Sequence, residues 1–363
     1  MPAITIMIKP VSGLCNMRCR YCFYEDELQY RSASVSSSTV MSQELLETAI
    51  RRILRSAEGA AHFLFQGGEP TLAGTDFYES VIHYQQKYNA KGLRITNAIQ
   101  TNGFHLSDEM AAFFAKERFL VGVSLDGTEL THDCNRKDRA GNGTRAQIVK
   151  NIEKLKHAGA EYNILCVVSA AVAKAPKQVF HALSSHRFLQ FIPCMNPMGG
   201  SSPEDALTVE DYGAFLCTLF DCYEQAWKNR TPVSIRTFDN WIRILQGVMP
   251  ENCGMIGHCG SSLMLERDGS LYPCDFYGTD EWYLGNIQES SILKILQSEK
   301  EQSFLTRSVP VPESCRSCEW YPLCRNGCMR ERSGEDGVNR WCEAHRTFFS
   351  YAFKRMRQMA RAL

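Results

Sequence analysis

Residues 4–24 read ITIMIKPVSGLCNMRCRYCFY, and they decide how the rest of the chain is interpreted. The apolar run Ile4–Ile8 predicts a short strand, and Cys15, Cys19 and Cys22 follow it within eight residues of one another. Three thiolates this close can hold three corners of one soft-metal site but cannot close a fourth. A four-iron cluster bound in this way keeps one iron open, which indicates chemistry on a bound molecule. The alternatives are a partial zinc site, although structural zinc sites favour paired CxxC units, and a coincidental group of buried thiols.

The composition is that of a globular protein with a sizeable core: 363 residues, 44% of them hydrophobic and 10% aromatic. Forty basic residues balance forty acidic ones, so no global field would attract nucleic acid or an anionic membrane. No apolar run approaches the length of a membrane span, and the first ten residues lack the features of a signal peptide. We therefore expect a cytoplasmic monomer without a nucleic-acid or membrane partner. Sixteen cysteines in such a chain indicate metal ligands before disulfides.

Up to about residue 235, short apolar strands alternate with amphipathic helices. Strands are expected at Ile4–Ile8, His62–Gln66, Leu93–Gln100, Phe119–Leu125, Tyr162–Val168 and Phe188–Ile192. Helices are expected at Ser42–Ser56, Thr75–Tyr88, Ser107–Lys116, Thr144–His157 and Pro176–Leu183. This alternation predicts an α/β fold with a parallel sheet, open or curled into a partial (β/α)6 barrel. Reactive groups in such sheets gather beyond the carboxyl ends of the strands, where the cysteine triad would lie.

The second part of the chain lacks the regular alternation of strands and helices. Residues 199–203, GGSSP, indicate a surface loop, and a long helix is expected at Val209–Trp227. After residue 250 the chain is rich in loops, cysteines and short hairpins, and the tail from His345 predicts a packed helix. The expected domains are 1–235 for the partial barrel, 236–345 for the cysteine-rich domain and 346–363 for a C-terminal helix.

The segment Gln66-Gly67-Gly68-Glu69-Pro70 closes the second expected strand. Two glycines let a backbone approach a ligand closely, and the Glu69 carboxylate can receive a ligand ammonium group. A Gly-Gly turn after a strand can equally be structural. Together with the cysteine triad, the segment becomes a strong signal.

The triad, with Tyr21 and Phe23 around its last cysteine, resembles the signature of radical S-adenosylmethionine enzymes. The resemblance implies that the three cysteines hold a 4Fe-4S cluster, whose open iron takes the amino and carboxylate groups of S-adenosylmethionine. The SLDG segment at 124–127 looks like the segment that approaches the ribose of S-adenosylmethionine in this superfamily, and an ordinary strand-end turn is the alternative. The implied cofactor-binding candidates are Tyr21, Gln66, Gly67, Gly68, Glu69, Ser124, Asp126, Arg136 and Arg145.

Eight further cysteines, between residues 253 and 342, resemble the SPASM domain of peptide-modifying radical enzymes. Eight thiolates suffice for two fully ligated 4Fe-4S clusters, which makes three clusters in total. A pair of zinc sites needs the same thiolate count and is the alternative. Gly260-Ser261 stand where a further cysteine is expected. The resemblance assigns one cluster to Cys253, Cys259, Cys274 and Cys328, and the other to Cys315, Cys318, Cys324 and Cys342.

Phrases along essentially the whole chain, such as FQGGEPTLAG at 65–74 and YPCDFY at 272–277, are similar to anaerobic sulfatase-maturating enzymes. The resemblance implies an oxidoreductase in which a 5′-deoxyadenosyl radical takes a Cβ hydrogen from the Ser or Cys of a sulfatase-type Cys/Ser-x-Pro/Ala-x-Arg segment. The product is Cα-formylglycine. Asp275 is the implied general base, Tyr24 and Asn102 are candidate substrate contacts, and a flavodoxin- or ferredoxin-type protein is the expected reductant.

Several alternatives stay open at this point. Asp275 can instead be a turn aspartate that caps backbone amides. The whole chain can instead be a SPASM maturase that makes a thioether cross-link or an epimer in a ribosomally made peptide. It can also be a non-catalytic electron-transfer or zinc-scaffold protein. Iron and sulfide analysis distinguishes the last possibility, because the enzyme needs about twelve irons per chain.

Overall fold

The computed structural model describes residues 3–31, 40–198 and 206–362, so the loop expected at 199–203 lies outside the described residues. The chain divides into two compact units that are interleaved in sequence. The first unit comprises residues 1–124, 135–162 and 261–304, and the second comprises residues 125–134, 163–260 and 305–363. The three-part division expected along the sequence stays a prediction.

The first unit contains a mixed sheet in the order β12-β11-β10-β1-β3-β4-β5. The pairs β10–β1, β1–β3, β3–β4 and β4–β5 are parallel, and the two pairs that join β10, β11 and β12 are antiparallel. In sequence order these strands are β1 (Ile4–Lys9), β3 (Ala60–Phe65), β4 (Arg94–Thr101), β5 (Leu120–Ser124), β10 (Leu263–Glu266), β11 (Ser270–Tyr272) and β12 (Gly285–Asn286).

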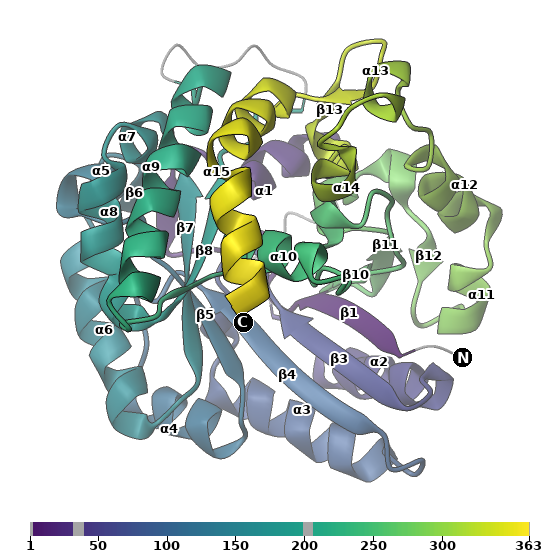
Figure 1. Ribbon diagram of the computed structural model, residues 1–363. Coiled ribbons are helices and arrows are strands. Elements are labelled where there is room, and N and C mark those ends of the chain that lie inside the picture. Colours follow the sequence, from purple (N-terminus) through teal and green to yellow (C-terminus); the bar gives the residue numbers. More distant parts are fainter. Residues whose placement is uncertain (1–2, 32–39, 199–205, 363) are drawn as a thin grey trace. The chain divides into compact units, whose positions relative to one another are not determined.

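Helices follow the parallel strands of this unit, and α2 packs against α3, as does α4 against α6 (Figure 1). Ser42 caps α2 by accepting a hydrogen bond from the Leu45 N–H, and the apolar face of α2 is buried, as its 3.6-residue period predicts. A separate two-stranded antiparallel sheet pairs β2 (Met17–Cys19) with β6 (Arg136–Asp138). The helices are α1 (Phe23–Glu27), α2 (Gln43–Ser56), α3 (Thr75–Tyr88), α4 (Asp108–Lys116), α6 (Arg145–Ala158), α11 (Ile292–Leu296) and α12 (Glu299–Arg307), which ends in the second unit.

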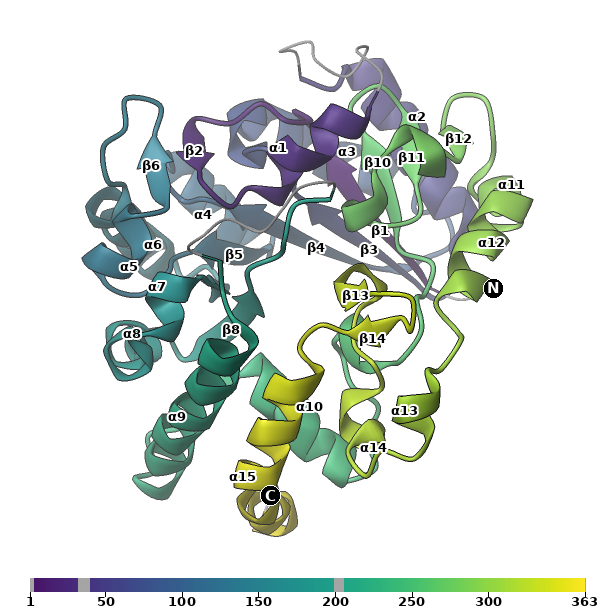
Figure 2. The same ribbon diagram turned by 90° about the horizontal axis from the view of Figure 1, so that it is seen from above.

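The second unit contains three parallel strands, β7 (Tyr162–Val168), β8 (Phe188–Pro193) and β9 (Ser234–Ile235), and a small hairpin of β13 (Arg332–Ser333) and β14 (Val338–Asn339). Its C-terminal helix α15 packs on α9 and α10, as Figures 1 and 2 both show. The helices are α5 (Glu129–Asp133), α7 (Ala170–Ala173), α8 (Pro176–Leu183), α9 (Val209–Lys228), α10 (Arg236–Leu245), α13 (Glu313–Arg316), α14 (Tyr321–Cys324) and α15 (Cys342–Ala362).

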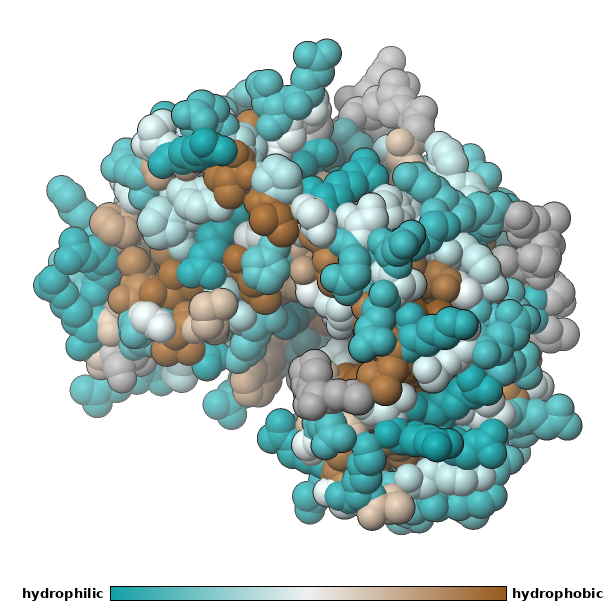
Figure 3. All heavy atoms as spheres, turned by 90° about the vertical axis from the view of Figure 1, so that its right-hand side faces the viewer, coloured by the Kyte–Doolittle hydropathy of each residue, from teal (hydrophilic) through white to brown (hydrophobic). Residues whose placement is uncertain are grey.

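The predicted α/β class, a sheet of parallel strands alternating with helices, is confirmed. All six expected strands are present, with ends displaced by at most two residues, and the expected tail helix begins three residues earlier, at Cys342. No helix among the described residues is both long enough and apolar enough to cross a membrane. The face drawn in Figure 3 is largely hydrophilic with smaller hydrophobic groups, as expected when most large apolar side chains pack inside.

Candidate active site

The loop that follows β1 is fastened to the segment that follows β3. The Gly68 N–H donates to the Ser12 carbonyl at 2.6 Å, and the Glu69 N–H donates to the Leu14 carbonyl at 2.8 Å. A Cβ atom on Gly68 would lie 2.2 Å from the Leu14 oxygen, which is too close for any side chain. The glycine predicted as a ligand contact is therefore required, first of all, to let the cysteine loop pack on the end of β3.

The three N-terminal cysteines lie together on this loop as free thiols. The pKa of the Cys15 thiol is raised to about 12, mainly by burial, and the nearby Cys19 and Cys22 contribute to the rise. Burial also raises the pKa of Cys22, whereas the Arg136 guanidinium lowers it. Thiols that resist ionisation in this way become ligands when a soft cation replaces their protons. The donor set fits the three corners of an iron–sulfur cluster.

Glu69 is fully buried, and its carboxylate accepts four hydrogen bonds. Oε1 accepts from the Thr71 N–H at 3.1 Å, the Thr71 hydroxyl at 2.6 Å and the Thr101 hydroxyl at 2.7 Å, and Oε2 accepts from the Asn102 N–H at 2.7 Å. Burial raises the pKa of Glu69, and these donors partly offset the rise. The Asn102 amide in turn donates to the Cys15 sulfur at 3.6 Å. Glu69 thus joins the ends of β3 and β4 beside the cysteine loop.

Three other cofactor-binding candidates lie near the two-stranded β2–β6 sheet and at the start of α6. The Tyr21 ring lies with its centroid 5.3 Å from the Arg136 guanidinium, in a cation–π contact. Arg136 Nη1 is 3.9 Å from the Cys19 sulfur, so this arginine contacts the thiol set. Arg145 is the first residue of α6 and is partly exposed.

The remaining two candidates fall in different compact units. Ser124 ends β5 in the first unit, where its hydroxyl accepts from the Gln100 amide at 3.2 Å. Asp126 is fully buried in the second unit, and its carboxylate accepts from the Val167 N–H at 2.9 Å. Both carry local hydrogen bonds at the carboxyl ends of parallel strands.

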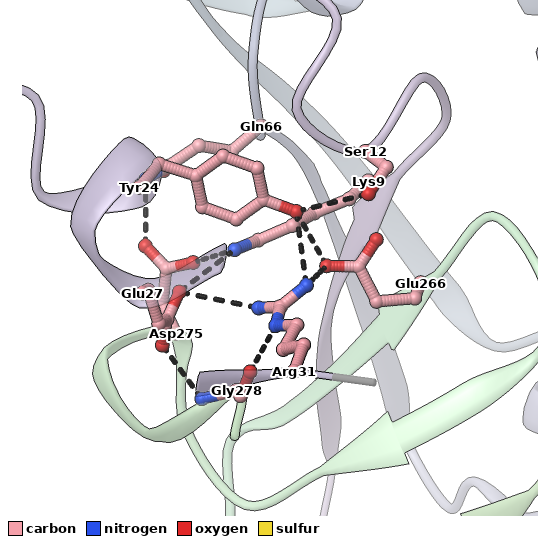
Figure 4. Close-up of polar contacts among 9 residues, drawn as sticks. All are labelled: Lys9, Ser12, Tyr24, Glu27, Arg31, Gln66, Glu266, Asp275 and Gly278. Atoms are coloured by element: carbon pink, nitrogen blue, oxygen red, sulfur yellow. Dashed lines mark hydrogen bonds and ion pairs between the residues drawn. The ribbon is translucent and has the colours of Figure 1, made fainter. Parts of the chain in front are cut away.

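Asp275 lies one residue after Cys274 and is held through both of its carboxylate oxygens (Figure 4). Oδ2 accepts a hydrogen bond from the Gln66 amide at 2.8 Å, and Oδ1 forms an ion pair with Lys9 Nζ at 2.6 Å. The Lys9 side chain is 0% exposed, whereas that of Asp275 keeps 9% of its surface exposed. The predicted base is therefore oriented by two partners and still retains some access.

Lys9 belongs to a larger buried group, the five-charge cluster of Lys9, Glu27, Arg31, Glu266 and Asp275 (Figure 4). Lys9 Nζ lies 3.7 Å from the Tyr24 ring centroid and 3.8 Å from Glu27 Oε2. Burial raises the pKa of Glu27 to about 7, although Lys9 and Arg31 lower it. For Glu266, the same two cations outweigh burial and lower the pKa. Two cations face three carboxylates, so the cluster carries one excess negative charge when all are ionised.

Four members of this cluster had not been predicted as site residues: Lys9, Glu27, Arg31 and Glu266. The sequence could have indicated two of them, because Lys9 is the last residue of the apolar strand β1 and Glu266 is the last residue of the apolar strand β10. A charged residue at the buried end of a strand needs a partner. The structure does bring together the predicted Gln66, Tyr24 and Asp275, with Lys9 between them.

The C-terminal cysteines form two groups in the second unit, and Cys274 lies in the first unit. Burial raises the pKa of the Cys328 thiol to about 12, and Cys253 and Cys259 lie close enough to contribute to that rise. The other group, Cys315, Cys318, Cys324 and Cys342, lines a single pocket. Four free thiols around one pocket fit a fully ligated cluster. Within the described ranges, no three His, Cys, Asp or Glu side chains are arranged to hold a single metal ion.

Comparison with known proteins agrees with these features. Residues 10–170 match the model of the radical SAM superfamily, and residues 257–319 match that of an iron-sulfur cluster-binding domain, SPASM. The chain is 39% identical to a cysteine-type anaerobic sulfatase-maturating enzyme of Clostridium perfringens, over 99% of each chain. It is 31% identical to a serine-type enzyme of Bacteroides thetaiotaomicron, over 99% of this chain and 91% of that protein.

Solved structures show the same likeness. The structure described as native anSMEcpe with bound AdoMet and Kp18Cys peptide is 39% identical to the chain, with a TM-score of 0.94 and coverage of 100% of both chains. Streptococcus suis SuiB bound to precursor peptide SuiA is only 15% identical, with a TM-score of 0.64 over 93% of this chain and 75% of that one. The similarity to SuiB shows only that the two proteins share a fold.

Proposed function

Because the chain belongs to the anaerobic sulfatase-maturating enzymes of the radical SAM superfamily, we propose that it converts a cysteine or serine of a sulfatase-type segment to Cα-formylglycine. The observation that carries this proposal is the 39% identity to a cysteine-type relative over 99% of both chains. Identity to the serine-type relative is lower, at 31%. Cysteine is therefore the proposed preferred target.

The cysteine sets would hold three 4Fe-4S clusters, with S-adenosylmethionine at the first. Cys15, Cys19 and Cys22 would hold the first cluster, and the eight C-terminal cysteines would hold two more. When bound, these groups supply the radical that removes a Cβ hydrogen and take up the electron that the substrate loses. The residues proposed for S-adenosylmethionine are Tyr21, Gln66, Gly67, Gly68, Glu69, Ser124, Asp126, Arg136 and Arg145. Tyr24 and Asn102 stay proposed contacts of the peptide.

Asp275 is the proposed general base, which takes the proton from the substrate thiol or hydroxyl. Lys9 and Gln66 orient its two oxygens, so that the carboxylate is positioned before the substrate arrives.

The proposed surroundings of the enzyme follow from the cysteines. Sixteen free cysteines favour a reducing compartment, so we place the chain in the cytoplasm. A monomer is the proposed oligomeric state. A flavodoxin- or ferredoxin-type protein is the proposed reductant. The proposed partner is a sulfatase-type peptide or protein, without nucleic acid or membrane.

The experiment that tests the function is an anaerobic assay of the reconstituted chain with matched peptides that carry Cys, Ser or Ala at the target position. Mass spectrometry should detect formylglycine from the Cys peptide, less from the Ser peptide and none from the Ala peptide. Asp275→Asn should still form 5′-deoxyadenosine but lose most formylglycine, because the positioned base is gone. Cleavage of S-adenosylmethionine without oxidation of either peptide by the unsubstituted chain would contradict the proposal, and full turnover by Asp275→Asn would remove Asp275 from the mechanism.

A further inference from the structure

The pocket lined by the last four cysteines has an additional polar side chain in its wall. His345 lines this pocket, and its Nδ1 atom lies 3.7 Å from the sulfur of Cys324. Cys324 ends α14, and His345 lies three residues after Cys342 at the start of α15, so both helices contribute a cysteine to the same pocket. Residues three apart lie on one side of a helix. The imidazole is thereby placed beside the sulfur of a proposed cluster ligand.

Aromatic rings hold this imidazole in place. The centroids of Tyr212, Trp241 and Phe349 lie 6.3, 5.9 and 6.0 Å from that of His345. These rings come from α9, α10 and α15, three helices that pack together in the second unit. Rings packed on several sides restrict the rotation of the imidazole, so the direction of Nδ1 is fixed by the fold rather than by the pocket alone.

We propose that His345 donates an N–H hydrogen bond to the sulfur of Cys324 and thereby raises the reduction potential of the cluster that this pocket would hold. A thiolate bound to iron has no proton and can only accept a hydrogen bond, so the nitrogen must be the donor. The proposal assigns the ring proton to Nδ1, because the Nδ1–H tautomer and the imidazolium form both donate from Nδ1, whereas the Nε2–H tautomer does not.

The effect on the potential follows from charge. Reduction makes the cluster and its sulfur ligands more negative, so a donor hydrogen bond stabilises the reduced state more than the oxidised one. One such bond changes the equilibrium constant for reduction by about tenfold, which is about 59 mV for a one-electron couple. A higher potential suits a cluster that accepts the electron lost by the substrate, and to that extent the inference rests on the proposed function.

The test is a redox titration of the reconstituted full-length chain, followed by electron paramagnetic resonance, with iron and sulfide content measured in parallel. In His345→Phe, the midpoint potential of one cluster signal should fall, which corresponds to an equilibrium constant for reduction that is about tenfold smaller. The midpoint potentials of the other cluster signals should not change. His345→Gln keeps an N–H donor and should recover most of the shift. His157→Phe, on the exposed face of α6, is the matched control and should change nothing.

A measurement on the unsubstituted chain covers the case in which His345→Phe fails to assemble. Pulsed electron paramagnetic resonance of chain labelled with ¹⁵N-histidine should show a weak histidine coupling to one reduced cluster. The inference is overturned if no such coupling appears or if iron content shows that this pocket holds no cluster. It is also overturned if the cluster has the same midpoint potential in His345→Phe and His345→Gln. Formylglycine formation, measured separately, reports on the proposed function, so the two can fail independently.

Discussion

Replacing Lys9 by methionine is the sharpest test of the five-charge cluster, because it removes one charge and keeps a side chain of similar length. The Lys9 ammonium lies 2.6 Å from Asp275 Oδ1, 3.8 Å from Glu27 Oε2 and 3.7 Å from the Tyr24 ring centroid. Its side chain is 0% exposed, so water cannot replace it easily. In Lys9→Met, three carboxylates would face the guanidinium of Arg31 without the ammonium group.

Removing one partner of a buried ion pair costs about 3–5 kcal/mol, because the other charge stays buried without compensation. Proton uptake by Glu27 limits that cost. Burial raises the pKa of Glu27 from 4.5 to about 7, so the folded chain binds a proton there that the unfolded chain has lost, and stability falls as the pH rises between these values. Lys9 lowers this pKa, so its removal raises the pKa further. The loss of stability in Lys9→Met should therefore be larger at pH 8 than at pH 6.

The assay is anaerobic denaturant unfolding at both pH values, together with the ratio of formylglycine to 5′-deoxyadenosine. That ratio should fall in Lys9→Met and stay close to its normal value in Lys9→Arg. The matched control is Lys87→Met. Lys87 Nζ lies 2.7 Å from Glu47 Oε1, so the pair is similarly close, but the Lys87 side chain is 48% exposed, and exposed pairs contribute little to stability. Lys9→Met/Asp275→Asn should recover part of the lost stability. A cost at Lys9 no larger than at Lys87, or additive effects in the double variant, would refute the reasoning.

Three further predictions concern the cofactor loop and one buried carboxylate. Alanine at all three N-terminal cysteines should abolish 5′-deoxyadenosine formation and leave about eight irons, which iron analysis checks; twelve irons would refute the assignment. Gly68→Ala should displace the cysteine loop and lower the iron content of the first site, because its Cβ would lie 2.2 Å from the Leu14 oxygen; unchanged content would contradict this. Burial raises the pKa of Glu301 from 4.5 to about 7, so Glu301→Gln should stabilise the chain by about 3 kcal/mol at pH 8 and hardly at all near pH 4, measured by unfolding. Equal effects at both pH values would contradict the burial argument.

Local patterns predicted six strands and most of the longer helices because their hydrophobic periods are long enough to be distinctive. The cap and apolar face of α2 are one example, and the buried face of α15 is another. The placement of β10 is different, since its four residues carry little periodicity and pair with a strand more than 250 residues earlier. The contacts around Asp275 are also distant in sequence, with 209 residues between it and Gln66. Resemblance to a family indicated Asp275, but neither spacing nor composition indicated Lys9.

The register of the sheet explains why these distant residues meet. Lys9 on β1 pairs directly with Glu266 on β10, and Ile8 pairs with Phe65, which places Gln66 level with Lys9 at the end of β3. Residues level with one another on neighbouring strands point to the same face of a sheet. A slip of one residue in β10 would turn Glu266 to the opposite face and shift the turn that carries Asp275. The cysteine loop leaves β1 at the same edge and is fastened to the end of β3, so one register positions both the proposed base and the proposed cofactor loop. The reaction therefore depends on strand pairing as much as on the reactive groups themselves.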